Sequence, residues 1–449
     1  MAHDNHVVHS LDEQFEFTDS AKKKIILAGL LGLALVAIGA FLVHKGWNIG
    51  AWQSPHEAAH AAGGEHAAAG HGAAHGGEHH GATLFTRIVA NIWLNAVYFT
   101  GIAVIGAFFV AYNYLAQAGW SVVIKRVPEA FPQFIAFTGV IIIAMFLIPA
   151  TRHELYHWTQ EGIMTPGSEN YDAIIAGKSW YLNFPFFLGR LVFYFGAWWM
   201  LQRTLRMNSL REDAEGGLDN YWGNFKFGII FLLIFGVTSS TSAWDLSMVI
   251  DTHWFSTMFG WYHLASWHVS GLATMMLVIL LLKDQGYLSV VNDSHIHDLG
   301  KLMFGFSVFW TYVWFSQYLL IFYANLPEET IYYRERFTGF GGRYWWPFHL
   351  NFALNFVVPF LILMMRNAKR NNTTLKLACA SILIGHWFDF YQMHMPGIAK
   401  DQGGIGIIEW GTTLFFASAF IYSVSHQLTK ANLIPKNHPF LEESLHHDI

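Results

Sequence analysis

The sequence contains a single cysteine, Cys379, and this scarcity excludes several kinds of redox protein. One thiol cannot form an internal disulfide or hold an iron–sulfur cluster. The C-x-x-C-H motif that attaches a c-type haem is also missing. We therefore expect a chain with no covalently bound cofactor, no metal site and no redox centre of its own.

Charged residues are also scarce: they make up 13% of the 449 residues, whereas soluble proteins carry ~25%. The formal net charge is −5 and no basic tract occurs, so no nucleic-acid partner is predicted. The first apolar segment lacks a signal-peptide cleavage pattern, and we interpret it as a retained helix. Hydrophobic residues reach 53% and fall in long runs, which is typical of an all-α integral membrane protein.

Ten apolar segments are each long enough for the ~20 residues that cross ~30 Å of hydrocarbon. They cover residues 25–43, 88–115, 128–150, 181–205, 224–247, 254–282, 299–325, 344–365, 373–394 and 406–428. The sequence therefore predicts ten transmembrane helices.

Two pairs of short matches indicate an internal repeat. Residues 149–156, after the third span, match residues 327–332 after the seventh, and Trp244-Asp245 in the fifth span matches Trp387-Phe-Asp389 in the ninth. Both pairs are four helices apart, which preserves helix direction. We predict two parallel four-helix bundles, helices 2–5 and 6–9, with helices 1 and 10 peripheral.

The predicted domains follow from these spans. They are a cytoplasmic tail (1–21), peripheral helix 1 (22–45), a His/Gly/Ala-rich periplasmic loop (46–84), the first bundle (85–250), the second bundle (251–395), and peripheral helix 10 with a cytoplasmic tail (396–449). With both termini in the cytoplasm, most of the 26 Lys and Arg residues fall on the cytoplasmic side, as the positive-inside rule requires. The His-rich loop is interpreted as solvated, and weak binding of Zn, Cu or Ni is the alternative.

Several ionisable residues lie inside the predicted spans, where each costs several kcal/mol unless it is paired or hydrated. Imidazole and carboxylate groups can exchange protons near neutral pH, so we predict a proton path through helices 4, 5, 6 and 9. The alternative is that each group only satisfies a helix interface. The candidate residues are Arg190, Asp245, His263, His268, His386 and Asp389.

A second candidate site is the short outer loop between the fifth and sixth spans, which carries Asp251, His253, Trp254 and Phe255. Acid–base groups beside aromatic rings suit either a quinone head group or the docking of a peripheral subunit. Glu409, at the start of the tenth span, is expected in interfacial water at the same outer level of the membrane as this loop.

Five runs of the sequence carry a resemblance to a known family: 244–248 (WDLSM), 254–260 (WFSTMFG), 297–302 (HDLGKL), 309–318 (FWTYVWFSQY) and 323–330 (YANLPEET). The chain resembles the NrfD and polysulfide-reductase family of membrane subunits over about residues 85–430, and within that family the subunits of bacterial alternative complex III. The family fold is two four-helix bundles with additional peripheral helices.

The resemblance implies a membrane subunit of a respiratory quinol:electron-acceptor oxidoreductase in the bacterial inner membrane. Such complexes oxidise a quinol, for example menaquinol, and pass electrons to cytochrome c or a terminal oxidase. The implied partners are a sister NrfD-type subunit, periplasmic iron–sulfur and multihaem cytochrome c subunits, and membrane lipids.

One departure from the family concerns the first helix of the first bundle, where the family's quinone site usually includes a His. This chain has Asn91, Trp93, Asn95 and Tyr98 there, but no His. We therefore expect quinol to bind in the sister subunit and this chain to conduct protons. A purely structural membrane anchor and a secondary transporter are the alternatives.

Overall fold

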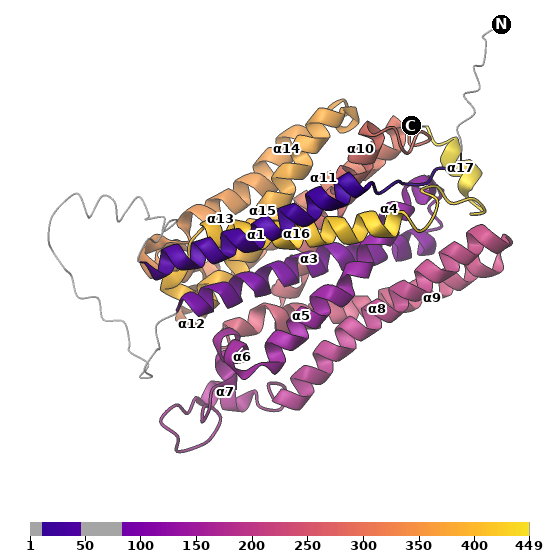
Figure 1. Ribbon diagram of the computed structural model, residues 1–449. Coiled ribbons are helices and arrows are strands. Elements are labelled where there is room, and N and C mark those ends of the chain that lie inside the picture. Colours follow the sequence, from indigo (N-terminus) through magenta and orange to yellow (C-terminus); the bar gives the residue numbers. More distant parts are fainter. Residues whose placement is uncertain (1–10, 46–82, 449) are drawn as a thin grey trace, which may run out of the picture.

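The computed structural model describes residues 11–45 and 83–448, and every named element in these ranges is a helix (Figure 1). The one extended pairing there is an isolated antiparallel bridge between Gln14 and Asn432. The all-α prediction is thus confirmed for this part of the chain. The predictions for the His-rich segment 46–82 lie outside the described residues.

Eight helical segments of the described residues are long and apolar enough to cross a membrane, as expected for a multi-pass membrane protein. They are α1 (Asp19–His44), α3 (Leu84–Leu115), α4 to α5 (Arg126–Leu147), α8 (Phe184–Glu215), α9 with the turn after it (Asp219–Ile250), α10 (Met258–Asp284), α13 to α14 (Trp345–Leu363) and α16 (Ile407–Leu428).

The other two predicted spans form long helices that are less apolar, α11 (Asp293–Ala324) and α15 (Asn372–Ile398). In α15 every residue from 385 to 396 is buried, because this helix packs against α3, α10 and α13. Its polar side chains therefore face protein rather than lipid. Helix α11 ends at Asn325, which adopts the left-handed conformation common at helix ends, and Pro327 starts α12 (Pro327–Phe337).

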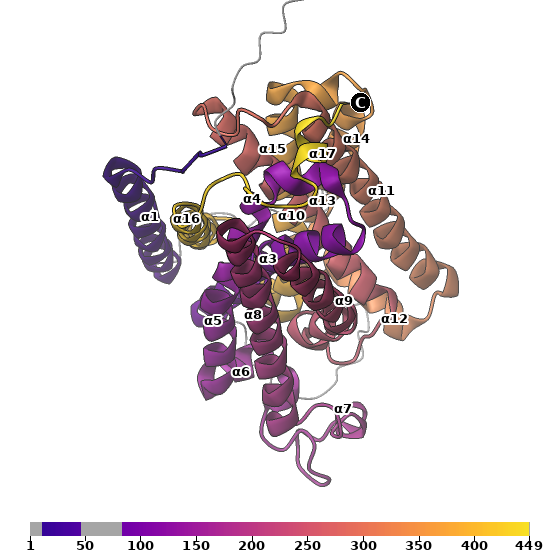
Figure 2. The same ribbon diagram turned by 90° about the vertical axis from the view of Figure 1, so that its right-hand side faces the viewer.

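Helix α3 is the centre of the molecule and α1 lies at its edge (Figures 1 and 2). The most apolar stretch of α3 is 94% buried, whereas that of α1 is 17% buried. Helix α3 contacts α5, α9, α10, α15 and α16, while α1 packs mainly along α16. The approach of α3 to α10 depends on Gly101, because a Cβ there would lie 1.7 Å from the Trp267 ring.

The helices pack in two rings, in each of which every helix contacts the next and the last contacts the first. In one, α3 contacts α5, α5 contacts α8, α8 contacts α9, and α9 returns to α3. In the other, the order is α10, α11, α14 (Val358–Leu363), α15 and again α10. The two groups touch where α3 meets α10 and α15, and where α9 meets α10.

Two spans are interrupted where proline removes a backbone donor. Pro128 and Pro132 accompany the change from α4 (Arg126–Ala130) through a 3₁₀ turn to α5 (Ile135–Leu147). A π-helical turn, Ala353–Val357, separates α13 (Trp345–Phe352) from α14, because the Pro359 ring cannot approach the carbonyl four residues earlier.

Short elements define the two ends of the helix assembly. At what we call the tail end, residues 11–18 and 429–448 lie together: Leu433 N donates to Glu13 O at 2.8 Å, and α17 (Leu441–Leu445) packs on the 3₁₀ helix Gly119–Ile124. The opposite end, the loop end, carries α6 (Pro149–Leu155), α7 (Ala173–Gly177) and α12 (Figure 1).

Candidate functional site

Asp389, in the buried part of α15, is the centre of the candidate site. Its carboxylate has no exposed surface and accepts hydrogen bonds from three neighbouring helices. The donors are the Tyr262 hydroxyl, Ser266 Oγ at 2.6 Å, Trp310 Nε1 at 2.9 Å and Asn351 Nδ2 at 2.9 Å. These donors are all uncharged, so the carboxylate is stabilised by hydrogen bonds and can still exchange a proton.

His386 lies one turn before Asp389 on the same helix face. Its Nδ1 is 3.5 Å from the Asp389 carboxylate, without hydrogen-bond geometry, and its ring meets Trp310 edge-on. Neither ring nitrogen has a hydrogen-bond partner among the described residues. The imidazole therefore lies beside the carboxylate without a hydrogen bond to it.

A second polar group joins α10, α15 and the turn after α9. Ser247 Oγ is 3.1 Å from His263 Nε2 and 3.0 Å from His394 Nε2. His394 Nδ1 lies 2.7 Å from Phe390 O, a carbonyl that can only accept, so Nδ1 carries the proton of the neutral ring. Ser247 then donates to His394 and accepts from His263. Each side chain thus donates to the next one, from His263 through Ser247 to His394.

Arg190 and Asp245 form a direct ion pair between α8 and α9. The guanidinium donates twice to the carboxylate, at 2.7 and 3.0 Å, and Tyr194 donates a third bond at 2.9 Å. The Arg190 guanidinium also stacks on the Tyr181 ring at 3.7 Å. This paired geometry satisfies both charges, so the pair stabilises the α8–α9 contact.

The structure brings the predicted path residues together only in part. Arg190 meets Asp245 and His386 lies beside Asp389, whereas His263 contacts neither pair and bonds to Ser247. His268 is separate: aromatic rings of Phe108, Tyr112 and Phe306 surround it. Neither nitrogen of His268 has a hydrogen-bond partner in the described part of the chain.

A ladder of hydroxyls along α10 was missed by the sequence reasoning. Ser266, Ser270 and Thr274 are buried; Ser270 and Thr274 each donate to the carbonyl four residues earlier, at 2.7 and 2.8 Å, and Ser266, which donates to Asp389, lies 3.0 Å from the carbonyl of Tyr262. At ~1.5 Å per residue the ladder covers ~12 Å, from Asp389 toward the tail end. The regular spacing of four residues was the signal that could have revealed it.

Sequence reasoning also missed a buried ion pair between α3 and α16. Arg87 donates to both Glu409 oxygens at 2.7 and 2.8 Å, and Asn91 adds a bond at 2.9 Å. The expectation that Glu409 lies in interfacial water is wrong, since its side chain has no exposed surface. The cause is α16, which packs directly on α3 and covers the group.

The four predicted rim residues do not form one surface. Trp254 stacks on Tyr332 of α12 with ring centres 3.9 Å apart, and Asp251 pairs with Arg336 at 3.3 Å. His253 instead contacts Asp172, at the start of α7, at 2.6 Å, and Phe255 is 63% exposed. The rim is therefore divided between α12, α7 and the exterior.

Tyr332, the stacking partner of Trp254, lies on α12 with Arg336 beneath its ring. Burial raises the pKa of the Tyr332 phenol, Arg336 lowers it, and the Asp251 and Asp389 carboxylates raise it further.

Glu335, also on α12, is a titratable group that the sequence did not reveal. Burial, followed by the nearby Asp251 carboxylate, raises the pKa of Glu335 to about 7. Because the folded protein holds this proton more tightly than the unfolded chain, the stabilisation is complete below pH ~4.5 and is lost as the pH rises through 7.

The Glu335→Gln variant should therefore unfold at a temperature that depends less on pH between 5 and 8. We expect it to be more stable than the wild type at pH 8, because it removes a carboxylate that is charged there beside Asp251. Thermal unfolding in detergent at pH 5 and pH 8 measures this effect. Glu328→Gln, on the exposed side of the same helix, is the matched control, and equal pH dependence in all three proteins would contradict the assignment.

No group of three or more His, Cys, Asp or Glu side chains in residues 11–45 and 83–448 is placed to hold a metal ion. The described site consists of carboxylate, imidazole, phenol and hydroxyl groups, which are side chains able to exchange protons. Comparisons of the sequence with protein-family models and with curated proteins found no match.

Proposed function

We propose that the chain is a membrane subunit of a respiratory quinol:electron-acceptor oxidoreductase of the alternative complex III type, and that it carries a transmembrane proton path. The family assignment rests on the sequence runs given above. The observation that carries the proton path is the Asp389 site, a fully buried carboxylate held by four uncharged donors from three other helices. A carboxylate within an apolar membrane protein is costly and rare, so its presence points to a functional role.

In this proposal α11 and α15 also cross the membrane, which gives ten spans. The two rings of helix contacts support two four-helix bundles. One consists of α3, α4 to α5, α8 and α9, and the other of α10, α11, α13 to α14 and α15. Helices α1 and α16 are peripheral. The excess of Lys and Arg supports a tail end on the cytoplasmic side of a bacterial inner membrane.

The proposed path has two halves that meet at Asp389. From the tail end, Thr274, Ser270 and Ser266 lead along α10 to the carboxylate. Toward the loop end, protons pass Tyr262 and Tyr332 and reach the acids Asp251 and Glu335. Hydroxyl groups both donate and accept, so such a series can pass a proton by successive exchange when water completes it.

Electron transfer takes place in the partner subunits, because the single cysteine of this chain cannot ligate a cluster or a c-type haem. The quinol binds in the sister subunit. This chain then serves as a proton-conducting subunit of an oxidoreductase and not as its redox enzyme.

The composition of the native complex tests this proposal. A tagged chain, mildly solubilised from its own membrane, should copurify with iron–sulfur and multihaem cytochrome c subunits. The chain separated from them should give no haem α band in a reduced-minus-oxidised spectrum. Isolation without partners, together with solute transport by the chain alone in proteoliposomes, would instead establish a secondary transporter.

A further inference from the structure

The C-terminal segment, residues 438–448, crosses the tail end of the molecule and contacts both groups of helices. It starts beside the end of α3 and the start of α9, continues over the 3₁₀ helix Gly119–Ile124, and ends at the start of α11. The 3₁₀ helix joins α3 to α4 and so belongs to the first group, whereas α11 belongs to the second. The segment therefore connects the two groups in addition to the direct contacts between their helices.

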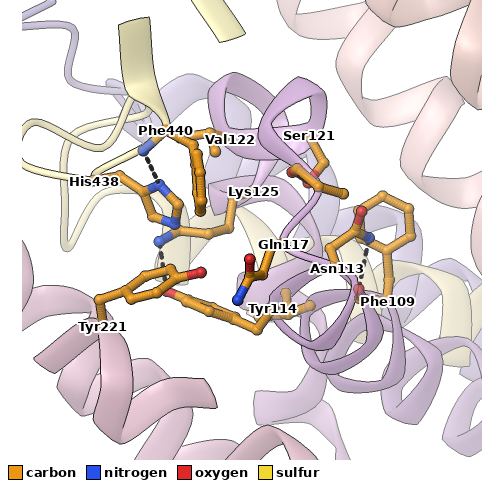
Figure 3. A pocket seen from close by; sticks show the side chains of 12 residues that line it. Phe109, Asn113, Tyr114, Gln117, Ser121, Val122, Lys125, Tyr221, His438 and Phe440 are labelled. Carbon is orange, nitrogen blue, oxygen red and sulfur yellow. Dashed lines mark hydrogen bonds between the residues drawn. The ribbon is translucent and has the colours of Figure 1, made fainter. Parts of the chain in front are cut away.

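Aromatic packing holds the first part of this segment (Figure 3). The ring centre of His438 lies 5.7 Å from that of Tyr114 and 5.5 Å from that of Tyr221, and the ring centre of Phe440 lies 5.8 Å from that of Tyr221. Leu441, the next residue, is 6% exposed. Apolar surface removed from water stabilises a contact in proportion to its area, so release of this part would expose the rings at a large cost.

Ser444 attaches the segment to the 3₁₀ helix. Its hydroxyl donates to Trp120 O at 3.0 Å and accepts from Val123 N at 3.3 Å, and the residue has no exposed surface. The short helix α17, which contains Ser444, packs on the same 3₁₀ helix. We call residues 438–444 the anchor, because buried rings and these two hydrogen bonds attach them to the first group of helices.

Polar groups join the end of the segment to the start of α11. Asn292 Nδ2 donates to His447 O at 2.7 Å, and Ser294 Oγ donates to Asp448 Oδ1 at 3.3 Å. The His447 imidazole contacts the Asp298 carboxylate through Nε2 at 2.7 Å. Asn292 and Asp448 are exposed, so water can reach these bonds and replace them.

His295 supplies a fourth bond between α11 and the segment. Its Nε2 lies 3.0 Å from Ser444 O, and because a carbonyl oxygen can only accept, the imidazole is the donor. The ring centres of His295 and His447 are 5.2 Å apart. We call the four hydrogen bonds from the start of α11 to the segment the latch.

The anchor and the latch differ in the free energy that their opening requires. A latch bond that opens is largely replaced by hydrogen bonds to water, so its net contribution to stability is small. Opening of the anchor also exposes aromatic rings, and no bond to water offsets that loss. Parts of a protein with few buried apolar contacts open more often than parts with many. The latch should therefore open while the anchor stays closed.

We propose that residues 438–448 form a strap that is anchored on the first group of helices, at α3, α9 and the 3₁₀ helix, and latched reversibly on the second group, at α11. When the latch opens, the anchor keeps the strap on the molecule, and the two groups of helices can shift against each other at the tail end. The proposal does not depend on the function proposed above, because it concerns only the connection between the two groups.

Hydrogen exchange followed by mass spectrometry, on the full chain mildly solubilised with its native partners, tests the strap. A chain that ends at Leu445 keeps α17 and lacks three of the four latch bonds. Asn292 Oδ1 caps the first turn of α11, and its Nδ2 is held by His447 O. Peptides with residues 292–300 should therefore exchange on the order of tenfold faster in the shortened chain. Peptides with residues 119–125 should exchange as in the wild type.

Three further variants separate the latch from the anchor. His447→Ala, which removes the contact with Asp298, should accelerate exchange of residues 292–300 by a smaller factor. Phe440→Ala loosens the anchor and should accelerate exchange of both peptides, because the latch alone does not hold the segment. His446→Ala is the matched control and should change neither peptide, since this side chain is 80% exposed and its hydrogen bond stays within α17, to Glu442 O.

Three outcomes would overturn the proposal. Wild-type exchange of residues 292–300 in the shortened chain would show that the latch bonds do not fasten the segment. Equal acceleration of both peptides in that chain would show that the segment opens as one unit, without a separate anchor. Acceleration of residues 119–125 alone in Phe440→Ala would show that the bonds to α11 hold the segment by themselves.

Discussion

Replacing Asp389 with asparagine should reduce the proton movement linked to quinol oxidation by on the order of tenfold or more, while quinol oxidation continues in the sister subunit. The carboxylate is the group where both halves of the proposed path meet. An amide of nearly the same shape cannot take up or release a proton near neutral pH. The effect should therefore appear in the number of protons moved per electron.

The hydrogen bonds around Asp389 determine how well this variant preserves the structure. Trp310 Nε1 and Ser266 Oγ both donate to Oδ2, and the indole can only donate, so the asparagine oxygen should occupy that position. The new amide group then replaces Oδ1, where Tyr262 can turn its hydroxyl to accept. Asn351 loses its acceptor, which costs about 1–3 kcal/mol of stability.

The measurement is proton release or uptake per electron in the complex reconstituted in liposomes. Asp401→Asn, an exposed acid at the loop end, is the control and should keep the wild-type ratio. His263→Gln tests the adjoining Ser247 group in the same assay. Unchanged ratios and turnover in both Asp389→Asn and His263→Gln would leave only a structural role, and failure to assemble would identify a packing network.

Removing Glu409 alone should destabilise the protein by about 3–5 kcal/mol, because it leaves the Arg87 charge buried without its carboxylate. The two side chains are 0% and 3% exposed, and the guanidinium donates to both oxygens. Since this pair joins α16 to α3, the loss should loosen α16 together with α1, which packs along it. Glu409→Ala is the variant to test.

The double variant Arg87→Met with Glu409→Met should recover most of that stability, because no uncompensated charge remains. About 1 kcal/mol should stay lost, since Gly406 N also donates to Glu409, at 2.8 Å. Unfolding midpoints in mild detergent compare the two variants with the wild type. A single variant as stable as the double variant would show that the ion pair does not stabilise the α3–α16 contact.

The sequence predicted the position of Asp389 better than its environment. Charge in hydrocarbon is costly, so a carboxylate within an apolar span must face the interior, and Asp389 does. Its four donors lie between 38 and 127 residues away in the chain. Helical spacing relates only residues three or four apart, and it therefore could not select Tyr262, Ser266 or Trp310 from the other polar residues.

The same limit explains the residues whose surroundings were misjudged. Glu409 was assigned to interfacial water from its place at the start of a span, but the packing of α16 on α3 covers it. His268 was predicted to be part of the proton path, yet its neighbours are aromatic rings. Depth follows from the count of residues along one helix, whereas partners depend on how that helix is rotated against the next.

The sequence by itself determined that this protein is helical and lies in a membrane, because each span of ~20 apolar residues must satisfy its own backbone hydrogen bonds in hydrocarbon. It also determined that ionisable groups would be drawn inward. Only the tertiary structure decided that α15 is surrounded by α3, α10 and α13, and that Asp389 there meets donors from three other helices. The physical reason is that side-chain packing between distant helices selects their rotation and contacts, and no pattern within a single span encodes that choice.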